Sequence, residues 1–70
     1  MKLHYYPETD SLYVALRPNV ASDTREIGPN VNADFGSDGV LVGIDIDMAS
    51  AHFDLASLET EGLPAVRKAA

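Results

Sequence analysis

The chain has 70 residues, of which 46% are hydrophobic, and its formal net charge is −6. A chain this short buries only roughly 60% of the surface that its unfolded form exposes, so it can build one domain with a modest core. The absence of Cys excludes disulfides, thiolate metal sites and thiol nucleophiles. The acidic charge argues against direct nucleic-acid binding, and no stretch approaches the ~18 apolar residues of a membrane span. We therefore expect a cytoplasmic protein with no nucleic-acid or membrane partner.

The first hairpin signal lies at the N-terminus. Residues 3–6 and 12–16 alternate apolar and polar side chains, and the turn residues Pro7 to Asp10 separate them. Alternation that is closed by Pro and Asp is typical of antiparallel strands. The expected partners across this ladder are Tyr6 with Ser11, Tyr5 with Leu12, and Leu3 with Val14.

A second hairpin signal covers residues 31–46, with its turn at Gly36-Ser-Asp-Gly39. The expected partners are Phe35 with Val40, Ala33 with Val42, and Val31 with Ile44, which again gathers apolar residues on one face. The same register places Asn30 opposite Asp45.

The remaining segments give weaker signals. The run Thr24 to Ile27, which Gly28-Pro29 stops, is expected to extend the third strand or to form a sheet edge. After Met48 the period changes, and Ser50 as N-cap with Ala51, Leu55 and Leu58 on one side predicts a helix over residues 51–61. The alternative is a short extended piece at residues 53–55 followed by one helical turn that Ser57 caps.

Together these elements predict an α+β fold in a single domain over residues 1–64. Two hairpins, about four strands in all, form a small antiparallel sheet, and a C-terminal helix or helical turn covers one face. That cover is expected to carry Phe53 or Leu55, together with Leu58. Residues 65–70 have no pattern and are expected to form a frayed tail.

The second face of the predicted sheet is less polar than a solvent-exposed face should be. Aromatic and small residues on such a face suggest an interface, and a small chain without disulfides often gains stability by self-association. We therefore expect a homodimer. The interface candidates are Tyr6, Tyr13, Ala15, Leu41 and Gly43.

No motif in the sequence predicts a catalytic residue or a cofactor site. Several acidic residues offer the oxygen ligands that Ca²⁺ and Mg²⁺ accept, and one histidine lies near them, but their spacing matches no known metal motif. Carboxylates on a sheet also serve solubility, which is the favoured interpretation. The residues of this minor metal alternative are Asp34, Asp45, Asp47 and His52.

The two hairpins carry a resemblance to a known family. Tyr6-Pro-Glu-Thr-Asp-Ser-Leu-Tyr-Val14, followed by Glu26-Ile-Gly28 and Gly39-Val-Leu-Val-Gly-Ile-Asp-Ile46, resembles a widespread family of very short prokaryotic proteins known only as a domain of unknown function. The family pattern has Asp where this chain has Tyr6, a charged residue at Ala15, and Glu at Asp45. The resemblance implies a small α+β fold without established catalytic residues. Some relatives are encoded beside short toxins, which implies an antitoxin-like role.

Two functional hypotheses follow from the sequence. The first is a non-catalytic protein-interaction module, dimeric and acidic, that binds a basic protein and is antitoxin-like. The alternative is a small metal-dependent binding protein or enzyme that uses the four residues of the metal alternative. A broad apolar interface favours the first hypothesis, and a pocket with converging carboxylates favours the second.

Overall fold

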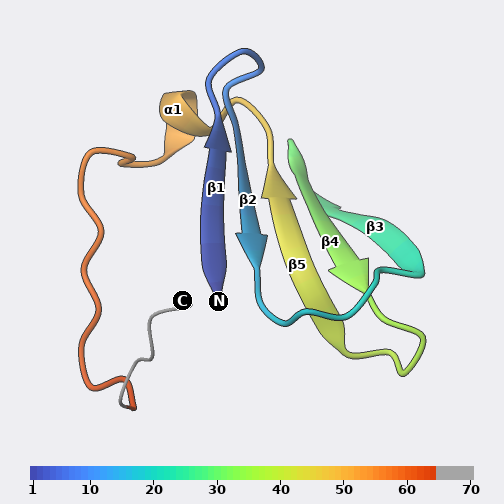
Figure 1. Cartoon of the computed structure of the whole chain (residues 1–70). Helices are drawn as coiled ribbons and strands as arrows, with labels where there is room; N and C mark the ends of the chain where they lie inside the picture. The colour runs from blue at the N-terminus through green and yellow to red at the C-terminus, as the bar shows by residue number, and fades with distance from the viewer. Residues whose placement is uncertain (65–70) are drawn as a thin grey trace.

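The computed structural model describes residues 1–64. Five strands and one short helix form the fold, which is mostly sheet (Figure 1). The elements are β1 (Lys2–Tyr6), β2 (Ser11–Ala15), β3 (Asp23–Gly28), β4 (Val31–Phe35), β5 (Leu41–Ile46) and α1 (Ala49–His52). The predicted small antiparallel sheet with a C-terminal helix is therefore confirmed, although the sheet has five strands and the sequence predicted about four. The predicted tail at 65–70 lies outside the described residues.

The strands form one antiparallel sheet in the order β1-β2-β5-β4-β3. β5 lies at the centre because β2 of the first hairpin and β4 of the second hairpin both pair with it. The additional strand is β3, which forms one edge of the sheet. Its sequence has no apolar alternation because an exposed edge strand requires none.

The register of the first hairpin is as predicted, with Tyr6 opposite Ser11, Tyr5 opposite Leu12 and Leu3 opposite Val14. The loop that joins these strands includes Asp10, whose φ of 53° lies in the left-handed region. Asp tolerates that conformation better than most residues, so the local turn chemistry and the hydrophobic pattern agree.

The predicted register of the second hairpin is wrong by one residue at Phe35 and by two residues at Ala33 and Val31. Phe35 lies opposite Leu41, Ala33 opposite Ile44, and Val31 opposite Ile46. The turn holds five residues, closed by the Gly36 N–H donating to the Val40 carbonyl at 2.9 Å, and a β-bulge at Val42 adds one more residue to β5. Because side chains alternate with a period of two, a slip of two residues leaves Val31, Ala33 and Ile44 on the predicted face.

The predicted helix over residues 51–61 is also wrong. The observed helix α1 is one turn long, ends at His52, and is followed by Phe53 in an extended conformation. Residues 53–64, which we call the arm, contain no helix, so the alternative is right about the extended piece and wrong about a helical turn at Ser57. Asp54 accepts hydrogen bonds from the Ala56 N–H at 3.0 Å and the Ser57 hydroxyl at 2.8 Å, and such local bonds compete with helix formation.

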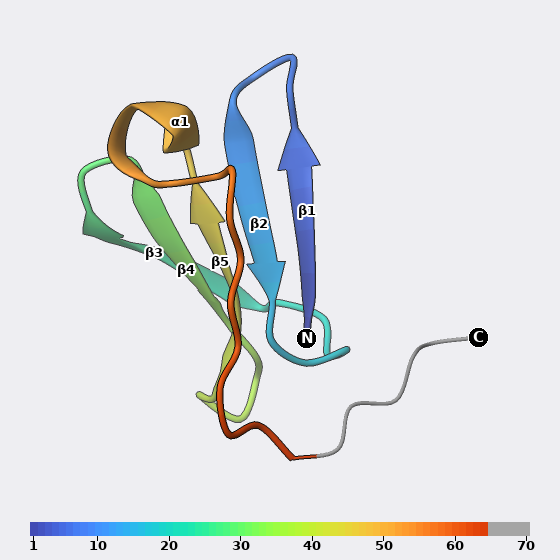
Figure 2. The ribbon, with the colours of Figure 1, turned by 90° about the vertical axis from the view of Figure 1, so that its left-hand side faces the viewer.

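The arm runs roughly along the strand direction and stands over one face of the sheet (Figures 1 and 2). It provides the cover that the sequence assigned to a helix, but every one of its residues is exposed. Within residues 1–64, no helix has the length and hydrophobicity needed to cross a membrane.

Candidate interaction surfaces

One face of the sheet, the apolar face, carries two rows of opposed residues that run across the strands. Residues directly opposite each other on neighbouring strands share a face, and the observed register therefore fixes the rows. The first row is Leu3, Val14, Ile44, Ala33 and Arg25, and the second is Tyr5, Leu12, Ile46, Val31 and Gly28.

The apolar face is poorly buried. Among the described residues, the buried hydrophobic side chains are Ala33 at 1%, Val42 at 4% and Ala49 at 0% exposure, and no large side chain is fully buried. Large side chains at the β1 edge of this face, such as Leu3, remain 46% exposed. The fold therefore lacks the second layer that normally buries such a face.

A groove of about 700 Å³ separates the apolar face from the arm. On the sheet side it is lined by Leu3, Tyr5, Leu12 and Ile46, and on the arm side by residues 53–58. Three apolar side chains of the arm remain exposed at this groove: Phe53 at 49%, Leu55 at 39% and Leu58 at 73%. The groove is thus an apolar cleft between two walls that do not touch closely enough to bury each other.

Asp10 holds the start of the arm in place. Its carboxylate accepts hydrogen bonds from the Ser50 hydroxyl at 2.7 Å and the Ser50 N–H at 3.2 Å, and its backbone carbonyl accepts one from the Ala49 N–H at 2.9 Å. The Tyr5 hydroxyl donates to the same carboxylate at 2.6 Å. The hydrogen bonds to the carboxylate lower the pKa of Asp10 below its ordinary value. The bond from Tyr5 has the largest effect, followed by the bonds from Ser50.

This role of Asp10 was not predicted, because its partner Ser50 lies 40 residues away in the sequence. The predicted N-cap, Ser50, lies inside α1 and donates to Asp10, whereas the N-cap position is occupied by Met48. A side chain from a distant turn therefore caps the helix, and no local pattern could have indicated it.

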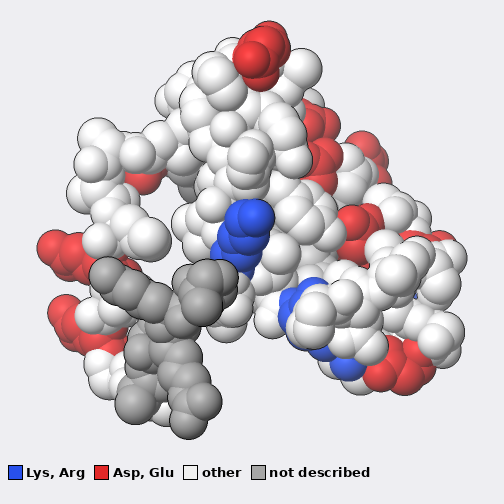
Figure 3. All heavy atoms as spheres, in the orientation of Figure 1, with Lys and Arg blue, Asp and Glu red and all other residues white. Residues whose placement is uncertain are grey.

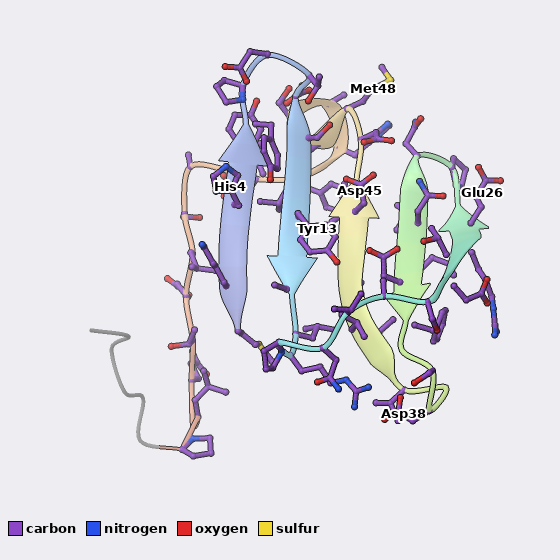
Figure 4. All side chains as sticks on the ribbon, turned by 45° about the vertical axis from the view of Figure 1, so that its right-hand side comes forward. His4, Tyr13, Glu26, Asp38, Asp45 and Met48 are labelled. Carbon is purple, nitrogen blue, oxygen red and sulfur yellow. The ribbon has the colours of Figure 1, made fainter. Side chains whose placement is uncertain are left out.

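On the opposite face, the polar face, side chains of different strands form hydrogen bonds with one another. Figure 4 shows the side chains, with Tyr13 labelled on this face. The Tyr13 hydroxyl donates to Asp34 Oδ2 at 2.8 Å, and the Thr24 hydroxyl donates to Asp34 Oδ1 at 2.6 Å. The first bond joins β2 to β4 across the central strand β5. The Asp34 carboxylate and partial burial raise the pKa of Tyr13.

Gly43 makes this bond across β5 possible. A methyl group at position 43 would lie 2.6 Å from Cζ of Tyr13, so the tyrosine ring lies directly on the backbone of Gly43. A glycine inside a strand often marks a bulge or the close approach of another backbone. The bulge is present at the neighbouring Val42, and the close approach comes from a side chain of the same chain.

The carboxylates of the metal alternative lie near one another, since the charges of Asp47 and Asp34 both act on Asp45, but each has different partners. Asp34 is engaged by Tyr13 and Thr24, and Asp45 lies opposite Asn32, not opposite Asn30 as the predicted register had it. Partial burial and then the nearby Asp47 raise the pKa of Asp45. In the part of the chain that the structure describes, no group of three or more His, Asp or Glu residues is arranged to hold a metal ion.

The remaining member of that alternative, His52, lies on α1. It lines a depression of about 300 Å³ together with Asp47 and Phe53, at the end of the sheet where α1 begins. Asp34 does not line this depression. The four residues of the metal alternative are therefore not brought together at one point.

The predicted interface residues have different surroundings. Tyr13 is hydrogen-bonded within the chain, Gly43 is buried beneath its ring, and Ala15 is half-buried opposite Gly43. Tyr6 is 47% exposed, and its ring centroid lies 4.2 Å from that of His4. The prediction that Leu41 lies on this face is wrong, because the bulge at Val42 places Leu41 opposite Phe35 of the apolar face.

Acidic side chains are spread over the visible surface, and few basic side chains lie among them (Figure 3). The arm contains Asp54, Glu59 and Glu61 and no Lys or Arg. One wall of the apolar groove is therefore acidic at its rim, which favours a ligand of positive charge.

Comparison with known proteins gives one match. No curated protein and no solved structure matches the chain. Residues 2–50, from the first residue of β1 to the middle of α1, match the family described as "Protein of unknown function (DUF2283)". This segment contains the whole sheet and the residues Asp10, Tyr13, Asp34 and Gly43 that organise it. Because the match spans more than half of the 70 residues, the chain belongs to the DUF2283 family of proteins of unknown function.

Proposed function

We propose that the protein is a non-catalytic protein-interaction module and that its binding surface is the apolar groove between the sheet and the arm. The observation that carries this proposal is the unfilled apolar face, where a groove of about 700 Å³ separates two apolar walls. Contiguous exposed apolar surface on a small protein marks an interaction site more often than it marks ordinary surface. A partner that inserts an apolar segment would complete the second layer of the fold.

The partner we propose is a basic protein. The chain carries a net charge of −6, and the described part of the arm contains three acidic residues and no basic one. A basic partner would insert apolar side chains into the groove while its Lys and Arg residues contact the acidic rim, which speeds association and improves specificity. Covering a basic protein in this way is an antitoxin-like role.

The alternative, a metal-dependent binding protein or enzyme, has less support. Asp34 is satisfied by two hydroxyl donors, and His52 lines a depression to which Asp34 does not contribute. An active site requires groups that converge on one substrate atom. Binding in the apolar groove requires only a matching shape and a hydrophobic surface.

The test uses two synthetic amphipathic helical peptides with identical apolar residues, one with Lys and one with Glu at all charged positions. Titration followed by NMR should show binding of the Lys peptide, with shifts at Leu12, Ile46 and the arm. The Glu peptide should bind at least about tenfold more weakly, because the charges of the peptide and the arm repel each other. Equal binding of both peptides, or shifts confined to the polar face, would contradict the proposal.

A matched pair of variants locates the site. Leu58→Ser changes an arm side chain of the groove that is 73% exposed, and Val20→Ser changes an aliphatic side chain outside the groove that is 87% exposed. Both should leave the fold intact, since neither side chain is buried. The first should weaken binding of the Lys peptide about tenfold and the second should leave it unchanged. Equal effects of the two variants would rule the groove out as the binding site.

A further inference from the structure

The two edges of the sheet differ in how well they are protected against pairing with another strand. β1 forms one edge and pairs only with β2. All five of its residues are exposed, and within residues 1–64 no further backbone hydrogen bond joins Lys2–Tyr6 to another strand. Its outer side therefore presents a row of free backbone donors and acceptors, which is a template for a further strand.

The opposite edge, β3, carries several of the features that prevent such pairing. The register between β3 and β4 is interrupted by a bulge between Glu26 and Gly28, and Pro29 follows directly. Charged residues occupy Asp23, Arg25 and Glu26 in the same strand. Bulges, prolines and charges are the devices by which natural proteins block edge pairing, and β1 has only the charge of Lys2 at its first position.

We propose that the protein forms a homodimer in which β1 pairs antiparallel with β1 of a second copy around a two-fold axis at His4. His4 is the middle residue of the strand, so this register pairs all five residues. Leu3 lies opposite Tyr5 of the partner subunit, and Lys2 lies opposite Tyr6 of the partner subunit. The product is one continuous sheet to which each copy contributes five strands. The two-fold symmetry uses the same edge of both copies, so the assembly stops at a dimer.

The charge and exposure of β1 favour a second copy of this chain over other partners at this edge. Two copies with a net charge of −6 each repel one another at most contacts, but β1 contains no acidic residue and one Lys. Opposed residues share a face, so Leu3 and Tyr5, which are 46% and 40% exposed, would cover one another across the axis. The whole chain exposes 5607 Å², roughly a third more than a compact protein of its mass, and a standard interface removes about 800 Å² from each partner.

This inference does not depend on the ligand of the apolar groove. Leu3 and Tyr5 belong both to β1 and to the groove, so the dimer would place the two grooves side by side on the same face of the extended sheet. If the Lys peptide does not bind, the proposed β1 contact is not contradicted. If the protein is monomeric, the proposed binding in the groove is not contradicted.

The test is a disulfide between two copies, which is unambiguous because the chain contains no Cys. In His4→Cys the two new thiols lie directly opposite each other, with Cα atoms about 4.5–5.5 Å apart, which suits a disulfide. In the matched control Tyr6→Cys the two thiols are separated by four residue positions, about 13 Å along the strands. Under mild oxidation we expect His4→Cys, and not Tyr6→Cys, to form a covalent dimer of twice the 7.5 kDa chain mass.

A second measurement uses non-covalent mass by light scattering at micromolar concentration. The unmodified protein should be dimeric, and His4→Glu and His4→Lys should each be monomeric, since like charges meet at the axis. A mixture of the two variants should restore a dimer that contains one of each. A monomeric unmodified protein, a dimer that persists in both charged variants, or equal crosslinking of the two Cys variants would overturn the inference.

Discussion

The two faces of the sheet are built from the same five strands but are completed in different ways. On the polar face, Tyr13, Thr24 and Asp34 satisfy one another across three strands, and the ring of Tyr13 covers Gly43. On the apolar face, the groove between the sheet and the arm stays open. The side chains of the polar face are joined by specific internal hydrogen bonds, whereas the apolar face keeps an open groove.

This difference shows why aromatic residues alone are a poor guide to an interface. Tyr13 looked like an exposed aromatic residue in the alternating pattern, yet its hydroxyl is used within the chain. Leu3 and Tyr5 looked like core residues, yet they are 46% and 40% exposed. The side chains that the sequence assigned to the core therefore form the better candidate surface, because a single sheet has no second layer to bury them.

The largest effect should come from disturbing the closed polar face. Gly43→Ala places a methyl group 2.6 Å from Cζ of Tyr13, and overpacking of this kind costs about 1–3 kcal/mol. The free energy of unfolding from denaturant titration should fall by that amount.

The control for this prediction is the same change in a Tyr13→Ala background, where the ring is absent. Gly43→Ala should then cost nothing beyond the small effect of the residue change, so the two changes are strongly coupled in a double-mutant cycle. Additive costs would show that Tyr13 does not lie on Gly43 and that the polar face is as open as the apolar face.

A smaller and more local effect is expected where the arm joins the sheet. Asp10→Asn weakens the bonds from Tyr5 and Ser50, so hydrogen exchange of residues 49–52 should accelerate while the amides of β5 stay protected. The pKa of Asp10 is lowered below 3.8 in the folded protein, so its contribution is present above pH 3.8 and is lost as the pH falls through the lowered pKa. The difference between the two proteins should therefore disappear in strong acid. If Asp10→Asn instead unfolds the whole sheet, the arm and the sheet form one cooperative unit.

The smallest effect is a gain in stability on the polar face. Partial burial and the nearby Asp47 raise the pKa of Asp45 above 3.8, so its charged form opposes folding at neutral pH. Asp45→Asn should therefore raise the melting temperature at pH 7. The gain should fade as the pH falls through the raised pKa and be absent below 3.8, where Asp45 is protonated in both folded and unfolded states. A lower melting temperature at pH 7 would mean that Asp45 accepts a stabilising bond that outweighs its burial.

Local patterns in the sequence were sufficient to predict the two hairpins and the two faces of the sheet. Alternation along β1 and β2, with Pro7 to Asp10 between them, predicted the correct register because the loop length and the hydrophobic period agree. In the second hairpin the register was wrong, but the faces of Val31, Ala33 and Ile44 were right, since a slip of two residues preserves the alternation. Hydrophobic alternation is a local property, and a single chain displays it without a structure.

How these parts meet depends on contacts between distant segments. The bulge at Val42, the bond of Tyr13 to Asp34 across β5, and the capping of α1 by Asp10 each join residues on segments far apart in the chain. The arm likewise takes its shape from Asp54 and from its attachment at Asp10, and not from the helical period of its apolar residues. Long-range hydrogen bonds depend on which strands become neighbours, and that choice is made by the whole sheet and not by any segment of the sequence.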